Sequence, residues 1–333
     1  MVDPAVLRRF SAGAARYEAH AHAQRLSAVD LLAYTVGSLA LSPRTNDGFV
    51  EPAPNRGQVM NSLEPAPKRG MVDTGGEPAP NRGQVMNSLE PAFNGGIVDT
   101  GGEPAPNRGR AFKILEPGCG TGLYTRMLLD AFRGASVFGV DISEAMVRVA
   151  KRGIDDPRAR FVVADAEEIA TGSYDLVTSN AAFQWFLSLP RTLARMASLL
   201  PGGGVLTFSF FGPETYAELD AALRASALRR GAHDGARVAA AAFHSREEIS
   251  DALSAAFPRW DVAERRYHQE FPTLADLLRS IRYTGTRGGG AQESWSPGKL
   301  ARVEEAYRER DGGIKATYQV FLCRGVIPEG GTG

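Results

Sequence analysis

The stretch "LEPGCGTG", residues 115–122, places glycines at three alternate positions: Gly118, Gly120 and Gly122. The apolar segment "FKILEP" (112–117) predicts a buried strand that enters this stretch, and "LYTRMLLDAF" (123–132) predicts a helix that follows it. Glycine lets the backbone turn sharply and lets a ligand lie against it without meeting a Cβ atom. A glycine turn between a strand and a helix is therefore a candidate nucleotide-binding loop, although the turn alone is a weak signal.

Apolar strand-like segments and helical segments alternate along the chain after this loop. The further strands that we predict are "SVFGVD" (136–141), "RFVVAD" (160–165), "YDLVTSN" (174–180) and "GGVLTFSFFG" (203–212). Such alternation predicts an α/β fold with a parallel sheet covered by helices on both faces. Ligands of such sheets bind at the carboxyl ends of the strands.

Acidic side chains stand at the ends of three of these strands. Glu116 precedes the glycine turn, where it can hold a ligand ammonium group or orient the turn. Asp141 ends the second strand, where a carboxylate can accept hydrogen bonds from both hydroxyls of a ribose. Asp165 ends the third strand, within reach of an adenine amino group. Together with the glycines, these residues indicate a nucleotide site strongly.

The same motifs resemble those of the class I S-adenosylmethionine-dependent methyltransferases, whose glycine loop has the pattern E/D-x-G-x-G-x-G. "VDIS" (140–143) and "ADAE" (164–167) match the next two motifs of that family. The resemblance implies S-adenosylmethionine as co-substrate. It also implies a Rossmann-like fold: a mostly parallel seven-stranded sheet with an antiparallel C-terminal strand, helices on both faces and an N-terminal helical lid. The cofactor-binding residues that it implies are Glu116, Gly118, Gly120, Gly122, Asp141, Ile142, Asp165, Ala166 and Asn180.

The segment "SNAAFQWF", residues 179–186, indicates which group receives the methyl. Methyltransferases that act on base or amide nitrogen usually carry N/D-P-P-Y here, and this chain does not. The segment instead resembles the "NxALQW" of carboxylate O-methyltransferases. That resemblance implies that Asn180 lies at the methionine end of the cofactor and that Gln184 and Trp185 wall the acceptor pocket. The alternative is that Trp185 is an ordinary core residue beneath the following helix.

Two distant segments bear on the choice between two families of carboxylate O-methyltransferase. "FSAGAARYEAHAHAQ" (10–24) and "FPTLADLLRSIRYTGTRGG" (271–289) resemble the malonyl-[acyl-carrier protein] methyltransferases of biotin synthesis. Tyr283 and Thr284 depart from the usual Ile-Gly-Ala of that family. The resemblance implies methylation of the free carboxylate of a malonyl thioester, carried by acyl carrier protein or by coenzyme A. The alternative is a small-molecule enzyme of the trans-aconitate methyltransferase type, or another class I methyltransferase.

The chemistry implied by a malonyl acceptor needs no general base. Its carboxylate is already ionised at neutral pH, because carboxyl pKa values lie near about 4. The protein has to exclude water and align the reacting atoms. Tyr17, Gln184 and Trp185 are predicted to position the acceptor. A Tyr hydroxyl or an Arg guanidinium suits the second carboxylate oxygen, and the candidates are Tyr17, Arg279 and Arg282.

The composition limits the other function classes. The 38 basic and 38 acidic residues give a formal net charge of zero, so no global field favours nucleic acid or an anionic membrane. Two cysteines and irregularly spaced histidines predict no metal site. With no signal-like N-terminus and no long apolar span, we expect a cytoplasmic enzyme. We also expect a monomer. An acidic carrier protein would bind a local basic run. The candidates are "LRR" (228–230), "ERR" (264–266), Arg279, Arg282 and Arg287.

A 13-residue repeat occupies residues 51–109, in which "EPAPNRGQVMNSL" alternates with variants such as "EPAPKRGMVDTGG". The repeats carry isolated apolar residues among Pro, Gly and Asn, and cannot bury enough apolar area to offset their ordering entropy. We therefore expect a helical lid at 1–46, a disordered insertion at 47–110 and a methyltransferase domain at 111–333.

Deletion of residues 51–102 is expected to leave both fold and activity intact, because the repeat is too poor in apolar residues to pack. Limited proteolysis of the full chain should cut within the repeat first. Thermal unfolding of the two forms provides the measurement. A melting temperature lowered by more than a few degrees would show that the repeat packs against the rest.

Overall fold

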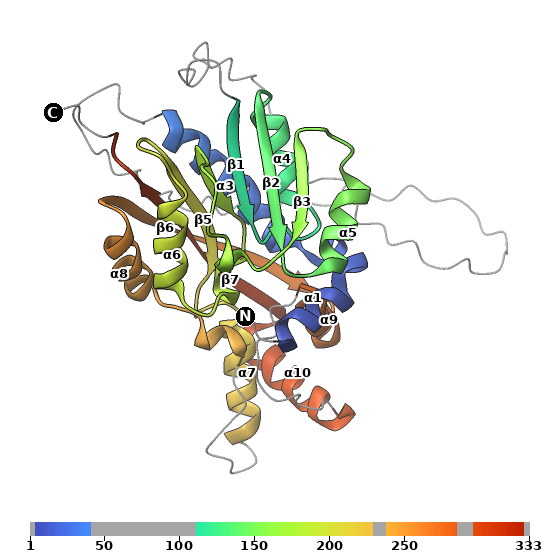
Figure 1. The fold of residues 1–333 in the computed structure, drawn as a ribbon. Coiled ribbons are helices and arrows are strands. Elements are labelled where there is room, and N and C mark those ends of the chain that lie inside the picture. Colours follow the sequence, from blue (N-terminus) through green and yellow to red (C-terminus); the bar gives the residue numbers. More distant parts are fainter. Residues whose placement is uncertain (1–3, 41–110, 229–237, 285–295, 330–333) are drawn as a thin grey trace, which may run out of the picture. The chain divides into compact units, whose positions relative to one another are not determined.

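Strand β1 (Phe112–Pro117) lies inside a seven-stranded sheet in the computed structural model of the chain, which describes residues 4–40, 111–228, 238–284 and 296–329. The strand order is β3-β2-β1-β4-β5-β7-β6 (Figure 1). The other strands are β2 (Ala135–Asp141), β3 (Ala159–Val163), β4 (Leu176–Ser179), β5 (Val205–Phe211), β6 (Arg259–Phe271) and β7 (Ile314–Val326).

The first five strands of the chain are parallel, and β7 runs antiparallel between β5 and β6. The chain passes from β1 outward to β2 and β3, and then returns to the other side of β1 as β4. This reversal is the switch point at which open α/β sheets bind ligands. The predicted Rossmann-like sheet with an antiparallel C-terminal strand is confirmed.

The family resemblance implied seven strands, but the sequence pattern located neither β6 nor β7. The 13 residues of β6 pair along their whole length with β7, from Arg259 opposite Val326 to Phe271 opposite Ile314. Charged residues occupy much of β6 because it is an edge strand with an exposed face, so the apolar alternation of a strand is weak there.

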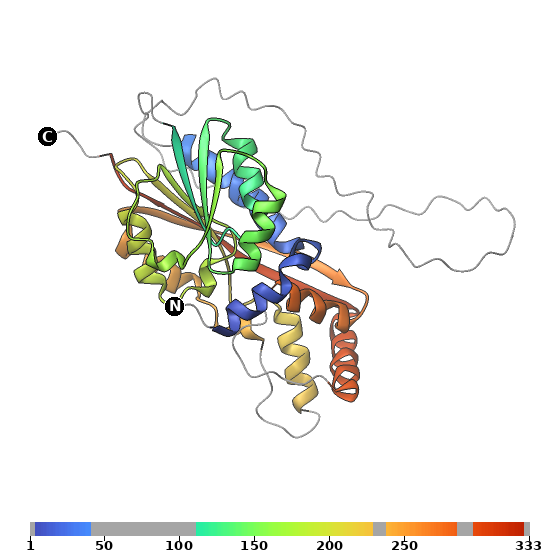
Figure 2. The ribbon, with the colours of Figure 1, turned by 45° about the vertical axis from the view of Figure 1, so that its right-hand side comes forward.

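Ten helices occur among the described residues, and they cover both faces of the sheet (Figure 2). Helices α6 and α8 bury one apolar face against residues such as Leu115, Val177 and Phe208. Helices α3, α4, α7, α9 and α10 cover the other face around Ile114 and Leu176. None of the described helices has the length and apolar character that a bilayer span requires. The helices are α1 (Pro4–Gly13), α2 (Tyr17–His20), α3 (His22–Ala40), α4 (Leu123–Ala131), α5 (Glu144–Gly153), α6 (Leu189–Ser198), α7 (Ala217–Leu228), α8 (Arg246–Ala256), α9 (Leu274–Thr284) and α10 (Pro297–Asp311).

Helix α3, placed by the sequence in the N-terminal lid, forms a layer of the core. Leu31 is fully buried against the sheet, and the Thr35 hydroxyl lies 2.8 Å from that of Thr207 on β5. Thr207 in turn donates to the hydroxyl of Thr178 on β4, at 2.9 Å. The part of residues 1–46 that can act as a lid is therefore α1 and α2. The predicted insertion at 47–110 lies outside the described residues.

Candidate active site

The glycine loop follows β1 with three left-handed residues. Gly118, Gly120 and Gly122 have φ angles of +70°, +55° and +81°, which residues with a side chain rarely adopt. A Cβ on Gly118 would lie 2.4 Å from the Cβ of Ala182, and one on Gly122 would lie 2.6 Å from Ile154. A Cβ on Gly120 would meet nothing within 4 Å. The outer two glycines thus permit close packing, and Gly120 borders open space that a ligand can enter.

The carboxylate of Asp141 is bound to this loop. The backbone N–H of Gly120 donates to its Oδ2 at 2.9 Å, and the backbone N–H of Ser143 donates to its Oδ1 at 2.8 Å. Burial raises the pKa of the Asp141 carboxyl, and the bonds from Ser143 and Gly120 oppose that rise. Each oxygen keeps a free lone pair, so the carboxylate can still accept two ribose hydroxyls. The neighbouring Ile142 is half-buried beside it.

Glu116 lies beneath the loop, with only 1% of its surface exposed. Its Oε2 accepts a hydrogen bond from the Thr125 hydroxyl of α4 at 2.5 Å. Burial raises the pKa of Glu116 to about 8, against the effect of the Thr125 bond and with the help of the nearby Asp141. The position favours a role in orienting the turn over direct contact with a ligand.

The loop after β3 is tied to the loop after β4. Asp165 caps a short helical turn (Ala166–Glu168) by accepting from the backbone N–H of Glu167 at 3.0 Å, and Ala166 is buried within that turn. Glu167 itself accepts from the backbone N–H of Leu187 at 3.1 Å and from the Thr192 hydroxyl at 2.9 Å. This link fixes the segment that carries Gln184 and Trp185 relative to β3.

Asn180, a predicted cofactor residue, anchors α3 to the sheet. Its Nδ2 donates to the Gln24 carbonyl at 2.9 Å, and its Oδ1 accepts from the hydroxyls of Ser27 and Ser209 at 2.9 and 2.8 Å. One Nδ2 hydrogen is left over for a ligand. Gln24 belongs to the N-terminal segment that carried the family resemblance, but the sequence alone did not connect it with Asn180.

Trp185 lies between aromatic rings from distant parts of the chain. Its ring centre is 5.7 Å from that of Phe10 and 5.5 Å from that of Phe243, both in edge-to-face geometry. Phe10 also approaches Tyr17, at 6.5 Å. Trp185 is half-buried, which differs from the fully buried position of a core residue. The structure therefore brings Trp185 and Tyr17 into one aromatic group. Phe243 is a member that sequence reasoning missed.

Gln184 stands in the same short helical turn, Phe183–Trp185. Its Nε2 donates to the Ala181 carbonyl at 2.7 Å. Its Oε1 is buried with no hydrogen-bond partner among the described residues. A buried acceptor without a partner is costly, and it suits a site that completes its hydrogen bonds when a ligand binds.

The N-terminal segment reaches over the glycine loop (Figure 1). The carboxylate of Glu18 accepts from the Thr121 hydroxyl at 2.8 Å and forms an ion pair with Arg126 of α4 at 2.5 Å. The hydroxyls of Ser11 and Ser143 lie 2.9 Å apart. Sequence reasoning missed these contacts, because nothing in the motifs links residues more than 100 positions apart.

Arg279 and Arg282 lie on the exposed face of α9, and Arg279 forms an ion pair with Asp276 at 2.5 Å. Among the described contacts, neither arginine touches Gln184 or Trp185. Tyr17 is the candidate for the second carboxylate oxygen that does lie in the aromatic group. Burial, together with the charges of Asp141 and Glu18, raises the pKa of Tyr17, so its phenol stays a hydrogen-bond donor.

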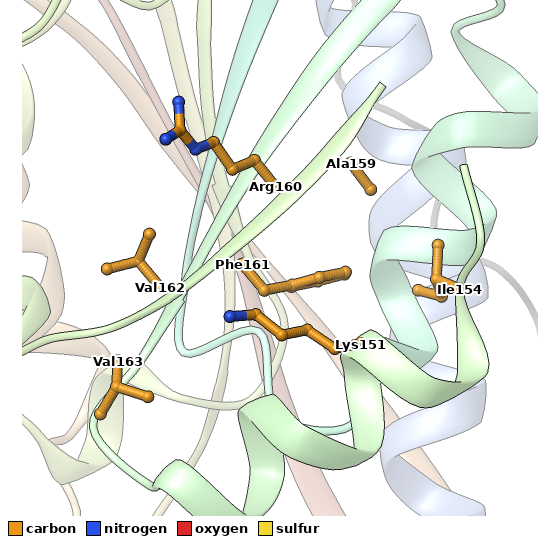
Figure 3. Close-up of a pocket in the computed structure, with 7 residues that line it drawn as sticks. All are labelled: Lys151, Ile154, Ala159, Arg160, Phe161, Val162 and Val163. Atoms are coloured by element: carbon orange, nitrogen blue, oxygen red, sulfur yellow. The ribbon is translucent and has the colours of Figure 1, made fainter. Parts of the chain in front are cut away.

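A surface hollow of about 490 Å³ lies along the outer edge of β3 and the end of α5, lined by residues such as Lys151, Arg160 and Val163 (Figure 3). None of the predicted site residues lines it. In the described part of the chain, no three His, Cys, Asp or Glu side chains gather as metal ligands would, and the absence of a metal stays a prediction.

A parallel sheet with a glycine loop after β1 and carboxyl groups at the ends of β1, β2 and β3 defines a class I methyltransferase. Residues 114–204 match the family model described as a methyltransferase domain. The chain is 34% identical over 218 residues to a malonyl-[acyl-carrier protein] O-methyltransferase of Geobacter sulfurreducens. The matched region covers 60% of this chain and 78% of that relative. The chain is 29% identical over 217 residues to the Halalkalibacterium halodurans enzyme of the same name, which covers 62% of this chain and 79% of the relative.

The chain therefore belongs to the malonyl-[acyl-carrier protein] O-methyltransferase family. Among solved structures it is similar to the YcgJ protein of Bacillus subtilis. That likeness has a TM-score of 0.45 and 16% identity, and it covers 66% of this chain and 93% of that one.

Replacement of Asp141 by Ala is expected to weaken binding of S-adenosylhomocysteine by about 2–4 kcal/mol, because two charge-assisted hydrogen bonds to the ribose are lost. Asp141→Asn, which keeps one acceptor oxygen, should lose less. Isothermal titration calorimetry checks both, with the exposed Asp155→Ala as control. Equal affinity of the Ala variant and the wild type would remove Asp141 from the binding site.

Glu116 is expected to make stability depend on pH. Its folded pKa of about 8 exceeds that of an unfolded carboxyl, so its contribution is complete at low pH and is lost as pH rises through about 8. Between pH 6 and 8 the free energy of unfolding should fall by about 2–3 kcal/mol relative to Glu116→Gln, whose amide does not titrate. Urea denaturation measures this, with the exposed Glu168→Gln as control. Parallel pH curves for wild type and Glu116→Gln would contradict the assignment.

Proposed function

We propose that this chain transfers a methyl group from S-adenosylmethionine to the free carboxylate of a malonyl thioester on acyl carrier protein, an early step of biotin synthesis. The product is the methyl ester. Membership of the family supports this substrate, since the relatives carry it in their names. The observation that carries the proposal is an aromatic group, formed by Phe10, Tyr17, Trp185 and Phe243. The acceptor would lie against these rings, beside the glycine loop.

The cofactor would be held at the carboxyl ends of three strands. Asp141 would accept the two ribose hydroxyls, and Asp165, with Ile142 and Ala166 beside it, would face the adenine. The backbone of Gly118, Gly120 and Gly122 would lie against the methionine portion, near the remaining hydrogen of Asn180. When bound, S-adenosylmethionine supplies a methyl carbon attached to a positively charged sulfur. The residues present fit this ligand, because Gly120 borders open space and the nearby carboxyl groups suit a cation.

Methyl transfer to the acceptor requires alignment of the reacting atoms and exclusion of water more than it requires acid–base catalysis. The acceptor carboxylate forms an O–C bond as the C–S bond breaks, and opposite charges cancel, so water would stabilise the reactants more than the transition state. The aromatic group excludes that water. The Tyr17 phenol can donate to the second carboxylate oxygen, and the Gln184 side chain has hydrogen-bonding capacity left for the acceptor. These contacts would hold oxygen, carbon and sulfur in line.

Transfer of labelled methyl groups tests the acceptor directly. Malonyl-carrier protein and malonyl coenzyme A should be methylated, and the label should be released by base, as it is from a methyl ester. An acceptor in which an amide replaces the free carboxylate should take up no label. Faster methylation of trans-aconitate than of any malonyl thioester would replace this proposal with the small-molecule alternative.

The substitution Trp185→Ala is expected to lower kcat/KM for methyl transfer by about 100-fold, because loss of the indole admits water and loosens the alignment of the acceptor. Binding of S-adenosylhomocysteine should change by less than about threefold. Trp185→Phe should retain more activity. Trp260→Phe serves as the matched control, because Trp260 on β6 is also half-buried and makes no ring contact with this aromatic group among the described residues. An equal loss of cofactor binding and of methyl transfer would show that Trp185 acts on folding and not on the acceptor.

A further inference from the structure

A cationic face forms where the N-terminal segment meets α9, made by Arg16, His20, Arg279, Arg282 and Tyr283. The Arg16 guanidinium donates to the Tyr283 hydroxyl at 2.6 Å and lies 5.5 Å from the centre of its ring. The His20 ring stacks on Tyr283 with a centre-to-centre distance of 4.7 Å. Tyr283 therefore joins the lid to α9 by contacts with both basic side chains. Figure 1 shows α1 beside α9.

The arginines of α9 extend this face. Arg279, Arg282 and Tyr283 are spaced three and four residues apart, so they share one side of the helix. The opposite side buries Leu277 and Ile281 in the core. Arg279 and Arg282 are both exposed.

The charge of this face is mostly uncompensated. Among the described residues, Asp276 is the one carboxylate that forms an ion pair with an arginine of this face, Arg279. Burial lowers the pKa of His20, and the charges of Arg279 and Arg16 lower it further, so the positive charge of the face is carried by its guanidinium groups. Several guanidinium groups with one carboxylate between them make a surface that attracts anions.

The basic run on β6 differs in this respect. Arg266 pairs with Glu214 at 2.7 Å and with Glu264 at 2.8 Å, and Arg265 lies 3.8 Å from Asp30. Carboxylates of the chain itself therefore neutralise the run at 264–266, although in the sequence this run appears as basic as the arginines of α9. The other predicted runs, at 228–230 and around Arg287, extend outside the described residues.

The cationic face belongs to the same segment that covers the site. Arg16 is exposed and precedes Tyr17, and within eight residues of it Phe10 contacts Trp185 and Glu18 holds the glycine loop. A partner bound to Arg16 and α9 would therefore contact the same N-terminal segment that covers the site.

We propose that this face docks the acidic carrier protein that presents the thioester, an inference that rests on the proposed function. Guanidinium groups bind carboxylates in forked geometry, and carboxylates are the groups that an acidic carrier presents. Because the net charge of the chain is zero, an acidic partner would be attracted by a local face of this kind and not by a global field.

The test compares two substrates and three sets of variants. Arg16→Gln combined with Arg279→Gln should raise the KM for malonyl-carrier protein about tenfold, with kcat unchanged. Added salt should raise the KM of the wild type more than that of this variant, since fewer charges remain to be screened. The kcat/KM for malonyl-N-acetylcysteamine, whose short arm is neutral, should stay the same. Arg16→Lys with Arg279→Lys should keep most of the affinity, and the ion-paired Arg266→Gln should behave as wild type.

Three other results are distinguishable. An unchanged KM for malonyl-carrier protein in the double Gln variant would overturn the docking face and leave the proposed function standing. An equal rise in the KM of Arg266→Gln would also overturn it, since any lost charge would then have the same effect. A wild-type protein that methylates neither thioester would remove the proposed function itself. Thermal unfolding and S-adenosylhomocysteine binding, both expected to be unchanged, exclude misfolding of the variants.

Discussion

The two backbone hydrogen bonds that Asp141 accepts determine the shape of the cofactor edge. By binding Gly120 and Ser143 together, its carboxylate joins the glycine loop to the turn after β2. That turn meets the lid through Ser11, and the loop meets the lid through Glu18. Through these contacts, Asp141 helps to position the N-terminal helices, and the same side chain is suited to hold a ribose.

The electrostatic character of this edge follows from the charged groups that make these contacts. Glu18, Glu116 and Asp141 bring three carboxyl groups near the loop, while Arg126 is the cation that pairs with one of them. Burial raises the pKa values of Glu116 and Asp141, and the excess of carboxyl groups over cations near the loop favours a cationic ligand. A sulfonium and an ammonium group are such cations, whereas the phosphates of a dinucleotide would be repelled.

Around Trp185, where we propose that the acceptor binds, hydrogen bonds and aromatic packing hold the structure. Asn180 uses its amide to fix α3 against β4 and β5, and Glu167 fixes the loop that carries Trp185. The rings of Phe10, Trp185 and Phe243 are then held in edge-to-face contact, around the acceptor that we propose. This arrangement agrees with a reaction in which an ionised carboxylate needs to lose water and gain alignment, and needs no base.

The sequence by itself determined the strand–loop–helix unit and the acidic strand ends, because glycine spacing and apolar periodicity act over a few neighbouring residues. It also predicted that these strands run parallel, which is enough to place Asp141 and Asp165 at one edge of the sheet. Only the tertiary structure decided that α3 is a core layer, that Phe10 and Phe243 flank Trp185, and that Arg16 faces α9 while Arg266 is neutralised. These outcomes depend on contacts between residues far apart in the chain. Packing sets such contacts, and no local pattern encodes them.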